Sequence, residues 1–424
     1  MWVWGIRSGL SILDQGLTSG AGFLLNLLLA RWLTSEEYGA FAVAFTTILF
    51  LFGFHTALLL EPMSVFGPST YSTNIAEYFK VFLKLHAGMT MLLSFLLCVT
   101  SGVAWYLGAR HELVAAFMGS ALALPLLLLL WLVRRMCYVV HRPLMAVWGS
   151  ASYFLLVVIG LFALYGSGRL TSFSAFVLIA VGSVPAVLVL LWQLRILEVR
   201  DQQAISFSQV VSENWRYGRW LFAGTVFFAI TSQTQTYLTA ALLGLGAAGI
   251  LRALQIPSLF MVQIVTAVGL LVLPAMAREF GSGGRKSLQK KAVWVSGGLA
   301  AMALAYAGLL AIVARPLEQL LFGGKFSSYG WLIPVLGLVP VLTGFATGFS
   351  MALRAAQKPH FDLLANMLSA PVGLLSALFF IHFWGIAGAG LSLVAGFAVY
   401  AAVFCYSFLN WFASPSAHAD VPSC

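Results

Sequence analysis

Polar side chains recur at helical spacing inside three long apolar stretches of this chain, and they are its first candidates for chemistry. A polar group in hydrocarbon is costly, so an ionisable or amide side chain in such a stretch is a candidate functional residue by default. Residues three or four positions apart share one face of a helix. The three polar stripes are Gln15, Ser19, Gly22 and Asn26; Thr225, Ser232, Gln235 and Thr239; and Arg252, Gln255, Gln263 and Thr266.

Two interpretations of these stripes stay open. In the first, they line a wet cavity that binds a polar substrate. In the second, they join helices, since Ser, Thr and Gln side chains hydrogen-bond across membrane helices. For the set as a whole we favour the cavity, whereas for any single Ser or Thr we favour helix–helix contact. The substrate-cavity candidates are Arg252, Gln255, Gln263, Gln235, Ser232, Gln15 and Asn26.

Two ionisable residues in these stretches have the sharpest alternatives. Arg252 can pair bidentately with a phosphate or another anion, or its long side chain can reach the outer headgroups. Asp14 is the candidate ion-coupling residue, able to carry a proton or bind a cation. Alternatively, Asp14 lies at the inner interface and pairs with Arg7 or another basic residue. His55 is interpreted as a hydrogen-bonded core histidine rather than a proton relay.

The composition shows which elements must position these residues. Of 424 residues, 61% are hydrophobic and only 8% are charged, whereas soluble domains carry roughly 25% charged residues. A membrane-spanning helix needs about 20 apolar residues, and the stretches are too uniformly apolar for barrel strands. The sequence therefore predicts an all-α polytopic membrane protein. Twelve spans are expected, at about 9–30, 39–60, 81–107, 113–133, 144–166, 173–194, 218–243, 248–273, 292–314, 330–352, 362–382 and 386–411.

The basic excess is mainly a signal of orientation. The net charge is +10, but most of the 23 lysines and arginines fall in alternate loops, on the side that would hold the N-terminus. By the positive-inside rule, both termini are then expected in the cytoplasm. The same residues can bind anionic lipid headgroups, and no nucleic-acid partner is expected. The cysteine and histidine spacings predict neither a disulfide framework nor a metal site, and no cofactor is expected.

The longest polar break near the middle of the chain divides it into two halves. We expect an N-terminal lobe at 1–195, a cytoplasmic linker at 196–217, a C-terminal lobe at 218–411 and a cytoplasmic tail at 412–424. The halves echo each other, because the segment Ala30 to Gly39 aligns with Ala240 to Gly249. Two like-oriented repeats of six spans are expected to hold a substrate site between them.

Short motifs spread along the chain resemble a known superfamily. They are Leu29 to Phe41, which contains Ala30-Arg31-Trp32-Leu33 and Glu37-Tyr38-Gly39; Leu251-Arg252-Ala253-Leu254-Gln255; Leu353-Arg354-Ala355-Ala356-Gln357-Lys358-Pro359; and Gly385 to Gly390. They resemble the polysaccharide-transporter (Wzx-type) branch of the multidrug/oligosaccharidyl-lipid/polysaccharide (MOP) flippase superfamily. The resemblance implies a MATE-like fold of two six-helix lobes and alternating access.

The resemblance also implies a function in the bacterial cytoplasmic (inner) membrane. Members of this branch move polyprenyl-diphosphate-linked oligosaccharides to the outer leaflet for polysaccharide assembly. The expected partners are this glycolipid, membrane lipids, and a polysaccharide polymerase and co-polymerase, and the expected oligomeric state is a monomer. Arg252 would meet the diphosphate, and movement of the negative charge outward is favoured by about 2.3 kcal/mol per charge per 100 mV.

Two other functions are weighed against this one. A cation-coupled multidrug antiporter of the same superfamily would use Asp14 and favour cationic substrates. A membrane polysaccharide polymerase or ligase would need catalytic side chains on a sizeable outer loop, and no acid/base pair is found there, so the sequence does not predict an enzyme. The sign of charge in the cavity separates the first two, because Arg252 favours an anion carrier and Asp14 alone favours the antiporter.

Overall fold

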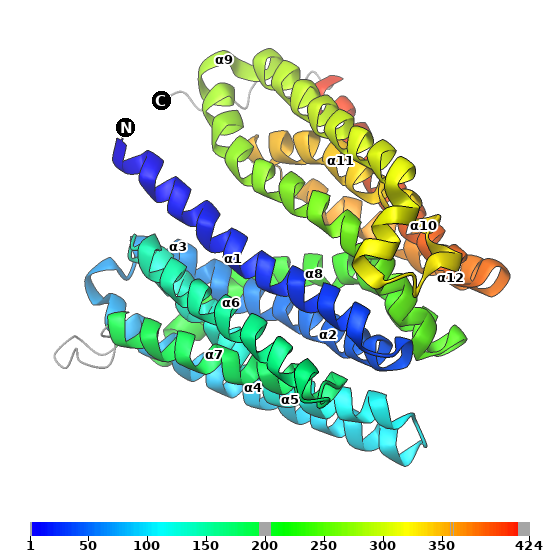
Figure 1. The fold of residues 1–424 in the computed structure, drawn as a ribbon. Helices are drawn as coiled ribbons and strands as arrows, with labels where there is room; N and C mark the ends of the chain where they lie inside the picture. Colours follow the sequence, from blue (N-terminus) through cyan, green and yellow to red (C-terminus); the bar gives the residue numbers. More distant parts are fainter. Residues whose placement is uncertain (1, 195–204, 357, 359, 414–424) are drawn as a thin grey trace. The chain divides into compact units, whose positions relative to one another are not determined.

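The described part of the chain is helical from end to end (Figure 1). The computed structural model describes residues 2–194, 205–356, 358 and 360–413, without the side chains of residues 2–8, 270, 274, 282 and 283. Within these ranges every regular element is an α-, 3₁₀- or π-helix. The expected linker at 196–217 and the expected tail at 412–424 therefore lie partly outside the described residues, as does residue 195.

Ten segments of the described chain are long and apolar enough to cross a membrane. One of them, α12 (His360–Ala413), is interrupted at Gly385, whose φ of 56° and ψ of −131° are not helical, so it corresponds to two of the expected spans. The apolar part of α8 (Phe207–Leu243) corresponds to the expected seventh span. The prediction of an all-helical, multi-pass membrane protein with about twelve spans is therefore confirmed.

The chain forms two compact units, Met1–Thr225 and Val226–Cys424, here called the N-terminal and C-terminal units. Their boundary falls inside α8, so the polar segment 207–217, expected as part of a linker, is helical and continuous with a span. The elements of the N-terminal unit before α8 are α1 (Trp2–Trp32), α2 (Ser35–His55), the π-helix η1 (Thr56–Leu60), α3 (Glu61–Ser69), η2 (Ser72–Asn74), α4 (Ile75–Tyr106), α5 (His111–Val139), α6 (Pro143–Gly166) and α7 (Ser172–Leu194).

The C-terminal unit begins in α8 and uses glycines to turn its long helices. Its further elements are α9 (Leu245–Phe322), η3 (Ser327–Tyr329), α10 (Leu332–Leu336), α11 (Leu338–Ala355) and α12. Gly284 divides α9 with φ 66° and ψ −161°, as Gly385 divides α12. Such angles cost little only for a residue without a Cβ. Each glycine therefore converts one continuous run of helix into two spans.

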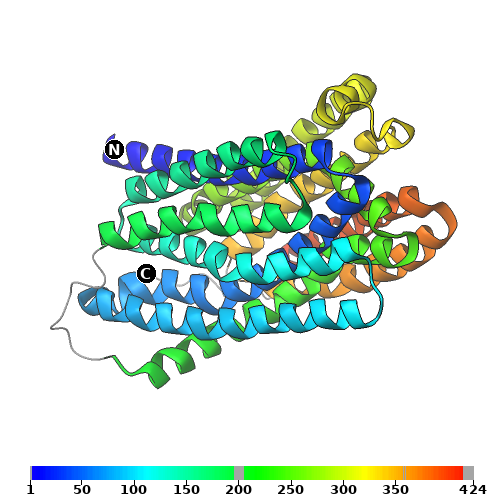
Figure 2. The same cartoon turned by 60° about the horizontal axis from the view of Figure 1, so that its bottom comes forward.

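The helices of the N-terminal unit lie side by side along most of their length (Figure 2), with α1 against α6 and α5 against α4 and α7. The middle of α5 shows how their polar backbone is kept satisfied. Pro125 cannot donate a hydrogen bond to the carbonyl of Ala121, four residues earlier. The hydroxyl of Ser94 on α4 donates to that carbonyl instead, at 2.9 Å. A bond between helices thus replaces one lost within α5.

The motif that follows the first span has a structural role. The Thr34 hydroxyl caps α2 by accepting a hydrogen bond from the Glu37 backbone N–H at 3.2 Å, which is the usual role of Thr at an N-cap. The Glu37 carboxylate accepts a hydrogen bond at 2.8 Å from the backbone N–H of Ser172, at the first turn of α7. This segment therefore fixes how α1, α2 and α7 meet.

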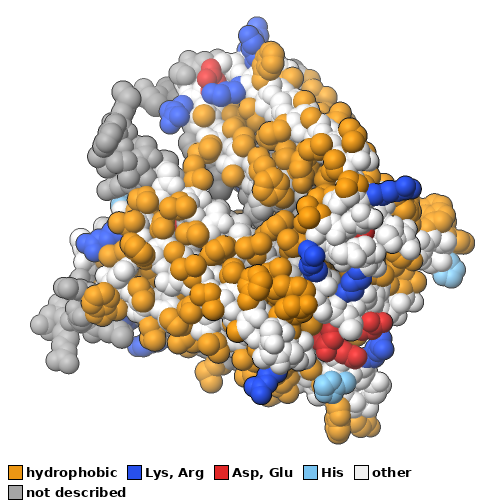
Figure 3. Space-filling view, viewed as in Figure 1, with side chains coloured by type: hydrophobic (Ala, Val, Ile, Leu, Met, Phe, Trp, Pro, Cys, Tyr) orange, Lys and Arg blue, Asp and Glu red, His pale blue; other side chains and the backbone are white. Residues whose placement is uncertain are grey.

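The surface is suited to lipid. Hydrophobic side chains dominate the face drawn in Figure 3, with comparatively few charged side chains among them. Large apolar residues are exposed on successive turns of α4, among them Met91, Phe95 and Val99. Isolated soluble proteins rarely expose continuous apolar surface on this scale. Hydrocarbon around the helices accounts for this surface without any partner protein.

Candidate functional site

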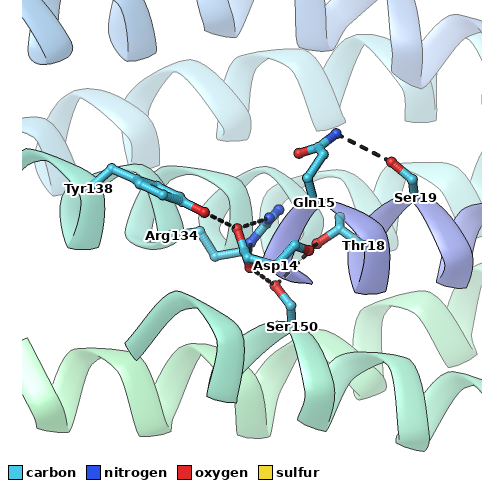
Figure 4. Close-up of polar contacts among 7 residues, drawn as sticks. All are labelled: Asp14, Gln15, Thr18, Ser19, Arg134, Tyr138 and Ser150. Atoms are coloured by element: carbon cyan, nitrogen blue, oxygen red, sulfur yellow. Dashed lines mark hydrogen bonds and ion pairs between the residues drawn. The ribbon is translucent and has the colours of Figure 1, made fainter. Parts of the chain in front are cut away.

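Asp14 is the centre of a buried polar network in the N-terminal unit (Figure 4). Its side chain is 1% exposed. The Arg134 guanidinium donates from Nε to one carboxylate oxygen at 3.2 Å and from Nη2 to the other at 2.6 Å. The Tyr138 hydroxyl donates to Asp14 at 2.5 Å, and the Ser150 hydroxyl donates to the oxygen that meets Arg134 Nε. Both carboxylate oxygens are thus occupied.

The network joins three helices and balances the charge of Asp14. Asp14 comes from α1, Arg134 and Tyr138 come from α5, and Ser150 comes from α6. Thr18, one turn along α1, donates to the Asp14 backbone carbonyl and to Ser150. A bidentate guanidinium–carboxylate pair is among the strongest hydrogen-bonded contacts. Asp14 is therefore held as an internal ion pair in this structure.

The helical pattern in the sequence identified Asp14, but it did not identify Arg134, Tyr138 or Ser150 as the side chains that bind it. The expected pairing was with Arg7 or another basic residue; the side chain of Arg7 lies outside the described residues, and Arg134 is the basic residue that pairs with Asp14. A signal was present, because Arg134 and Tyr138 are spaced by one helical turn at the C-terminal end of an apolar stretch. What sequence spacing lacks is the pairing of α5 with α1. The assignment of Asp14 as an ion-coupling residue stays a prediction.

The polar stripe of α1 is divided between different surroundings. Gln15 is exposed and its amide donates to Ser19 at 3.2 Å. Asn26 is buried, where its amide donates to the Gly22 carbonyl at 2.9 Å and its carbonyl accepts from the Tyr38 hydroxyl of α2 at 3.4 Å. Asn26 thus joins helices, while Gln15 and Ser19 keep polar atoms on an otherwise apolar surface.

In the C-terminal unit the stripe of α9 begins at a buried cation. Arg252 is 9% exposed, and its Nη1 donates to the side-chain oxygen of Gln255 at 3.3 Å. Two turns further on, Gln263 and Thr266 are exposed. The stripe therefore runs from a buried guanidinium to amide and hydroxyl groups that solvent or a substrate can reach.

The stripe of α8 has a different character. Gln235 is fully buried, and neither its amide nitrogen nor its amide oxygen has a hydrogen-bond partner among the described residues. One turn earlier, Thr231 shares a 3.0 Å hydrogen bond with Ser369 of α12, so it joins two helices. Ser232 is half-buried and donates only to the Phe228 carbonyl of its own helix. Thr239, one turn later, is also buried with its hydroxyl unpartnered among the described residues, so this stripe keeps unused hydrogen-bonding capacity at Gln235 and Thr239.

Other clusters of chemically active side chains are few in the described ranges. They contain no group of three or more His, Cys, Asp or Glu residues able to hold a metal ion. His55 and His86 do meet, inside the N-terminal unit, with 3.0 Å between ring nitrogens. This pair was not expected, because the two residues are 31 positions apart and follow no motif.

The fold is that of MATE transporters and related flippases. No family model matches the chain, and no curated protein matches it in sequence. Among solved structures, it is similar to an inward-facing multidrug resistance MATE family transporter of the MOP superfamily, with a TM-score of 0.79 and 12% identity over 97% of this chain and 100% of the other.

Two further solved structures show the same likeness. The lipid II flippase MurJ, in an inward closed conformation, gives a TM-score of 0.71 at 12% identity, covering 94% of this chain and 87% of that one. A mutant of the Vibrio cholerae MATE transporter VcmN gives a TM-score of 0.65 at 16% identity, covering 96% of this chain and 97% of that one. The expected MATE-like fold is confirmed, and the assignment to the polysaccharide branch stays a prediction.

Proposed function

We propose that this protein is a flippase that moves polyprenyl-diphosphate-linked oligosaccharides across the bacterial cytoplasmic membrane by alternating access. The observation that carries the proposal is Arg252, a guanidinium held 9% exposed in an apolar spanning helix. Placing a cation there is expensive, and such residues mark substrate or ion pathways. A diphosphate is a ligand whose geometry matches the guanidinium fork.

The fold supports the same substrate class. One of the solved structures with this fold is a flippase for lipid II by its own description. A lipid-linked sugar needs hydrocarbon for its tail and hydrogen-bonding groups for its head. Within the C-terminal unit, Gln255 and Gln263 on the helix of Arg252 would supply such groups, and exposed apolar helix faces would accommodate the tail.

The Asp14 network is less favourable to the alternative of a cation-coupled multidrug antiporter. An antiporter that binds cations at Asp14 needs a carboxylate with oxygens free to bind them. Both oxygens here are engaged, and Arg134 supplies the balancing charge. A cation would have to displace a bidentate guanidinium. The proposed orientation, with both termini in the cytoplasm, and the proposed partnership with a polymerase and co-polymerase follow from the charge distribution and the resemblance.

The experiment is complementation of a deletion strain. Cells that lack this protein are expected to accumulate the lipid-linked oligosaccharide on the inner leaflet, and wild-type protein should clear it. Arg252→Ala should restore little export at equal membrane abundance, with Arg169→Ala, in an exposed loop, as the matched control. Clearance of the glycolipid by Arg252→Ala at the wild-type rate would contradict the role of Arg252. Absence of any accumulation in the deletion strain would contradict the function itself.

A further inference from the structure

A continuous series of hydrogen-bonded groups crosses the interior of the N-terminal unit from α2 to α5. His55 on α2 and His86 on α4 are 0% and 4% exposed. His55 Nε2 lies 3.0 Å from His86 Nδ1, and His86 Nε2 lies 3.2 Å from the carbonyl oxygen of Pro125 on α5. The two rings meet edge to face. Three helices are therefore linked through two imidazoles.

The hydrogen-bond pattern fixes which ring nitrogens of His55 and His86 carry protons. A carbonyl oxygen only accepts, so His86 Nε2 carries the proton that is donated to Pro125. In a neutral ring the other nitrogen is then an acceptor, so His86 Nδ1 accepts from the Nε2–H of His55. His55 Nδ1 is left as an unprotonated acceptor, and it is buried without a hydrogen-bond partner among the described residues. The series of hydrogen bonds therefore ends at His55 Nδ1, an atom that can accept a proton.

Within the described ranges, no charged side chain is hydrogen-bonded or ion-paired to His55 Nδ1. The acidic and basic groups on the helices around the pair are Glu36 and Glu37 on α2, Glu61 on α3, Glu77, Lys80 and Lys84 on α4, Glu112, Arg134 and Arg135 on α5, and Glu213, Arg216 and Arg219 on α8. Glu77 pairs with Lys80. Arg134 pairs with Asp14, and Arg135 lies 3.7 Å from Glu61. Lys84, Arg216 and Arg219 are exposed. Among the described residues, neither ring has a hydrogen bond or ion pair with any of these groups.

A segment able to change shape follows His55 directly. Residues Thr56–Leu60 form a π-helix, in which the Glu61 backbone N–H bonds to the Thr56 carbonyl. Such one-residue bulges are rare and are frequently found at functional sites. Pro62 follows at the start of α3, and Gly218 of α8 allows close approach, since a Cβ there would lie 2.5 Å from the Ala57 carbonyl oxygen. The bulge is therefore held from outside by packing.

We propose that the His55–His86 pair is a proton-binding site and that its protonation repacks the π-helical turn Thr56–Leu60. One proton from water binds His55 Nδ1, and the ring becomes an imidazolium that still donates through Nε2 to His86. No bond within the pair breaks. A buried, unpaired cation is unfavourable, so the protonated pair favours an arrangement in which water reaches the ring.

A change in the π-helical turn would produce the arrangement in which water reaches the protonated ring. Conversion of the bulge to α-helix removes one residue from the turn, which rotates the following helix by about 100°. Glu61, Pro62 and the rest of α3 would rotate with it. The proposal goes beyond the flippase function, because it names a proton as a ligand and a hinge that responds to it, whatever the transported substrate.

The first test is ¹⁵N NMR of histidine-labelled full-length protein in nanodiscs, titrated from about pH 8 to well below the usual histidine midpoint of about pH 6.5, because burial disfavours a charged ring. The chain has seven histidines, and His55→Gln and His86→Gln assign the two resonances of interest. At high pH both rings should show the Nε2–H tautomer. On acidification the pair should take up one proton in a transition shared by both rings, and His86→Gln should shift that transition for His55. His382→Gln, at an exposed position on α12, is the control.

The second test is hydrogen exchange of the wild-type protein. Its result does not depend on whether a substituted protein folds. After correction for intrinsic pH dependence, amide protection in 56–60 should fall at least about tenfold through the same transition, the signature of local opening. Two results would overturn the proposal: both rings stay neutral throughout, or protection in 56–60 is unchanged while they titrate. Neither measurement uses the transported substrate, so a failure here is separate from a failure of the flippase function.

Discussion

Asp14 and Arg134 lie 120 residues apart in sequence and share two hydrogen bonds, at 3.2 and 2.6 Å. The carboxylate is buried and the guanidinium nearly so. Burial of an ion pair contributes little net stability, but removal of one partner leaves a buried charge uncompensated. The two side chains therefore tie α1 to α5, and loss of either one leaves a buried charge between these helices.

Asp14→Ala should destabilise the protein by about 3–5 kcal/mol, because Arg134 is left charged without its partner. Thermal or denaturant unfolding in detergent measures this loss. The double variant Asp14→Leu with Arg134→Met should be less destabilised than Asp14→Ala alone. Arg110→Ala, which removes an exposed partner of Glu112 at 4.0 Å, is the control and should change stability by at most about 1 kcal/mol. Equal losses in Asp14→Ala and the double variant would contradict this account.

The coupling role of Asp14 has its own test. If Asp14 exchanges Arg134 for a proton or a sodium ion during transport, Asp14→Asn should abolish any dependence of transport on pH or sodium. The measurement is initial transport rate in proteoliposomes under imposed ion gradients. A pH dependence that survives Asp14→Asn but disappears in His55→Gln would assign it to the histidine pair instead.

Arg252→Ala should weaken transport of an anionic glycolipid by at least roughly tenfold, because a hydrogen bond to a charged group contributes about 1.5–3 kcal/mol. Arg252→Lys should recover part of the activity, since the lysine keeps the charge but cannot bind bidentately. Export is measured at equal membrane abundance. An uncharged lipid-linked sugar that is transported with the same dependence on Arg252 would show that the residue does not act on the diphosphate.

Gly218→Ala should destabilise the N-terminal unit by about 1–3 kcal/mol, the usual cost of overpacking. The new methyl group would lie 2.5 Å from the Ala57 carbonyl oxygen, which belongs to the π-helix backbone and cannot move aside like a flexible side chain. Gly224→Ala on the same helix is the matched control, because nothing lies within 4 Å of its Cβ. That control should be neutral or gain up to about 1 kcal/mol from helix propensity. A similar effect of both substitutions would remove the argument for close packing at Gly218.

Tyr71 and Glu213 predict a pH dependence at the edge of the N-terminal unit. The Tyr71 hydroxyl donates to Glu213 at 2.8 Å. Burial first, then this hydrogen bond and the carboxylate charge, raises the pKa of Tyr71 from 10.0 to about 12. Between these values the folded protein keeps a proton that the unfolded chain releases. The stabilisation is therefore complete below pH 10 and is lost as the pH rises through about 12.

The measurement is unfolding of wild type and Tyr71→Phe at several alkaline pH values. At neutral pH the variant should lose about 1.5 kcal/mol, the lower range for a hydrogen bond to a charged group. The difference between the two proteins should shrink as the pH rises above 10. A difference that stays constant up to pH 12 would show that Tyr71 does not titrate as described.

Much of the fold follows from the sequence because lipid imposes simple rules. Spans of about 20 apolar residues and a helical rather than barrel class are consequences of backbone hydrogen bonding in hydrocarbon. The ends of the helices were less predictable. Residues 207–217 are polar, yet they continue α8 as helix, because one buried face, including Asn214, packs while Trp215 and Arg216 are exposed.

The candidate site was predictable only one helix at a time. Helical spacing identified Gln15, Asn26 and Arg252 as polar residues on apolar helices, since that property belongs to a single segment. It did not identify Arg134 as the partner of Asp14, or His86 as the partner of His55. These pairings depend on which helices become neighbours, and no local pattern contains that information. His55 was interpreted as a satisfied core residue, but one of its two ring nitrogens has no hydrogen-bond partner in the described part of the chain.

The Asp14–Arg134 pair has a consequence for biosynthesis. The span Gly9–Trp32 has the lowest hydropathy of the ten candidate spans in the described chain, partly because it contains Asp14. A carboxylate inside an inserting span opposes its release into lipid, at a cost that reaches about 2.5–3.5 kcal/mol at the centre of the helix. The charge that balances Asp14 is synthesised 120 residues later, after three further hydrophobic segments have begun to emerge. We therefore expect the span Gly9–Trp32 to stay beside the insertion machinery until α5 arrives.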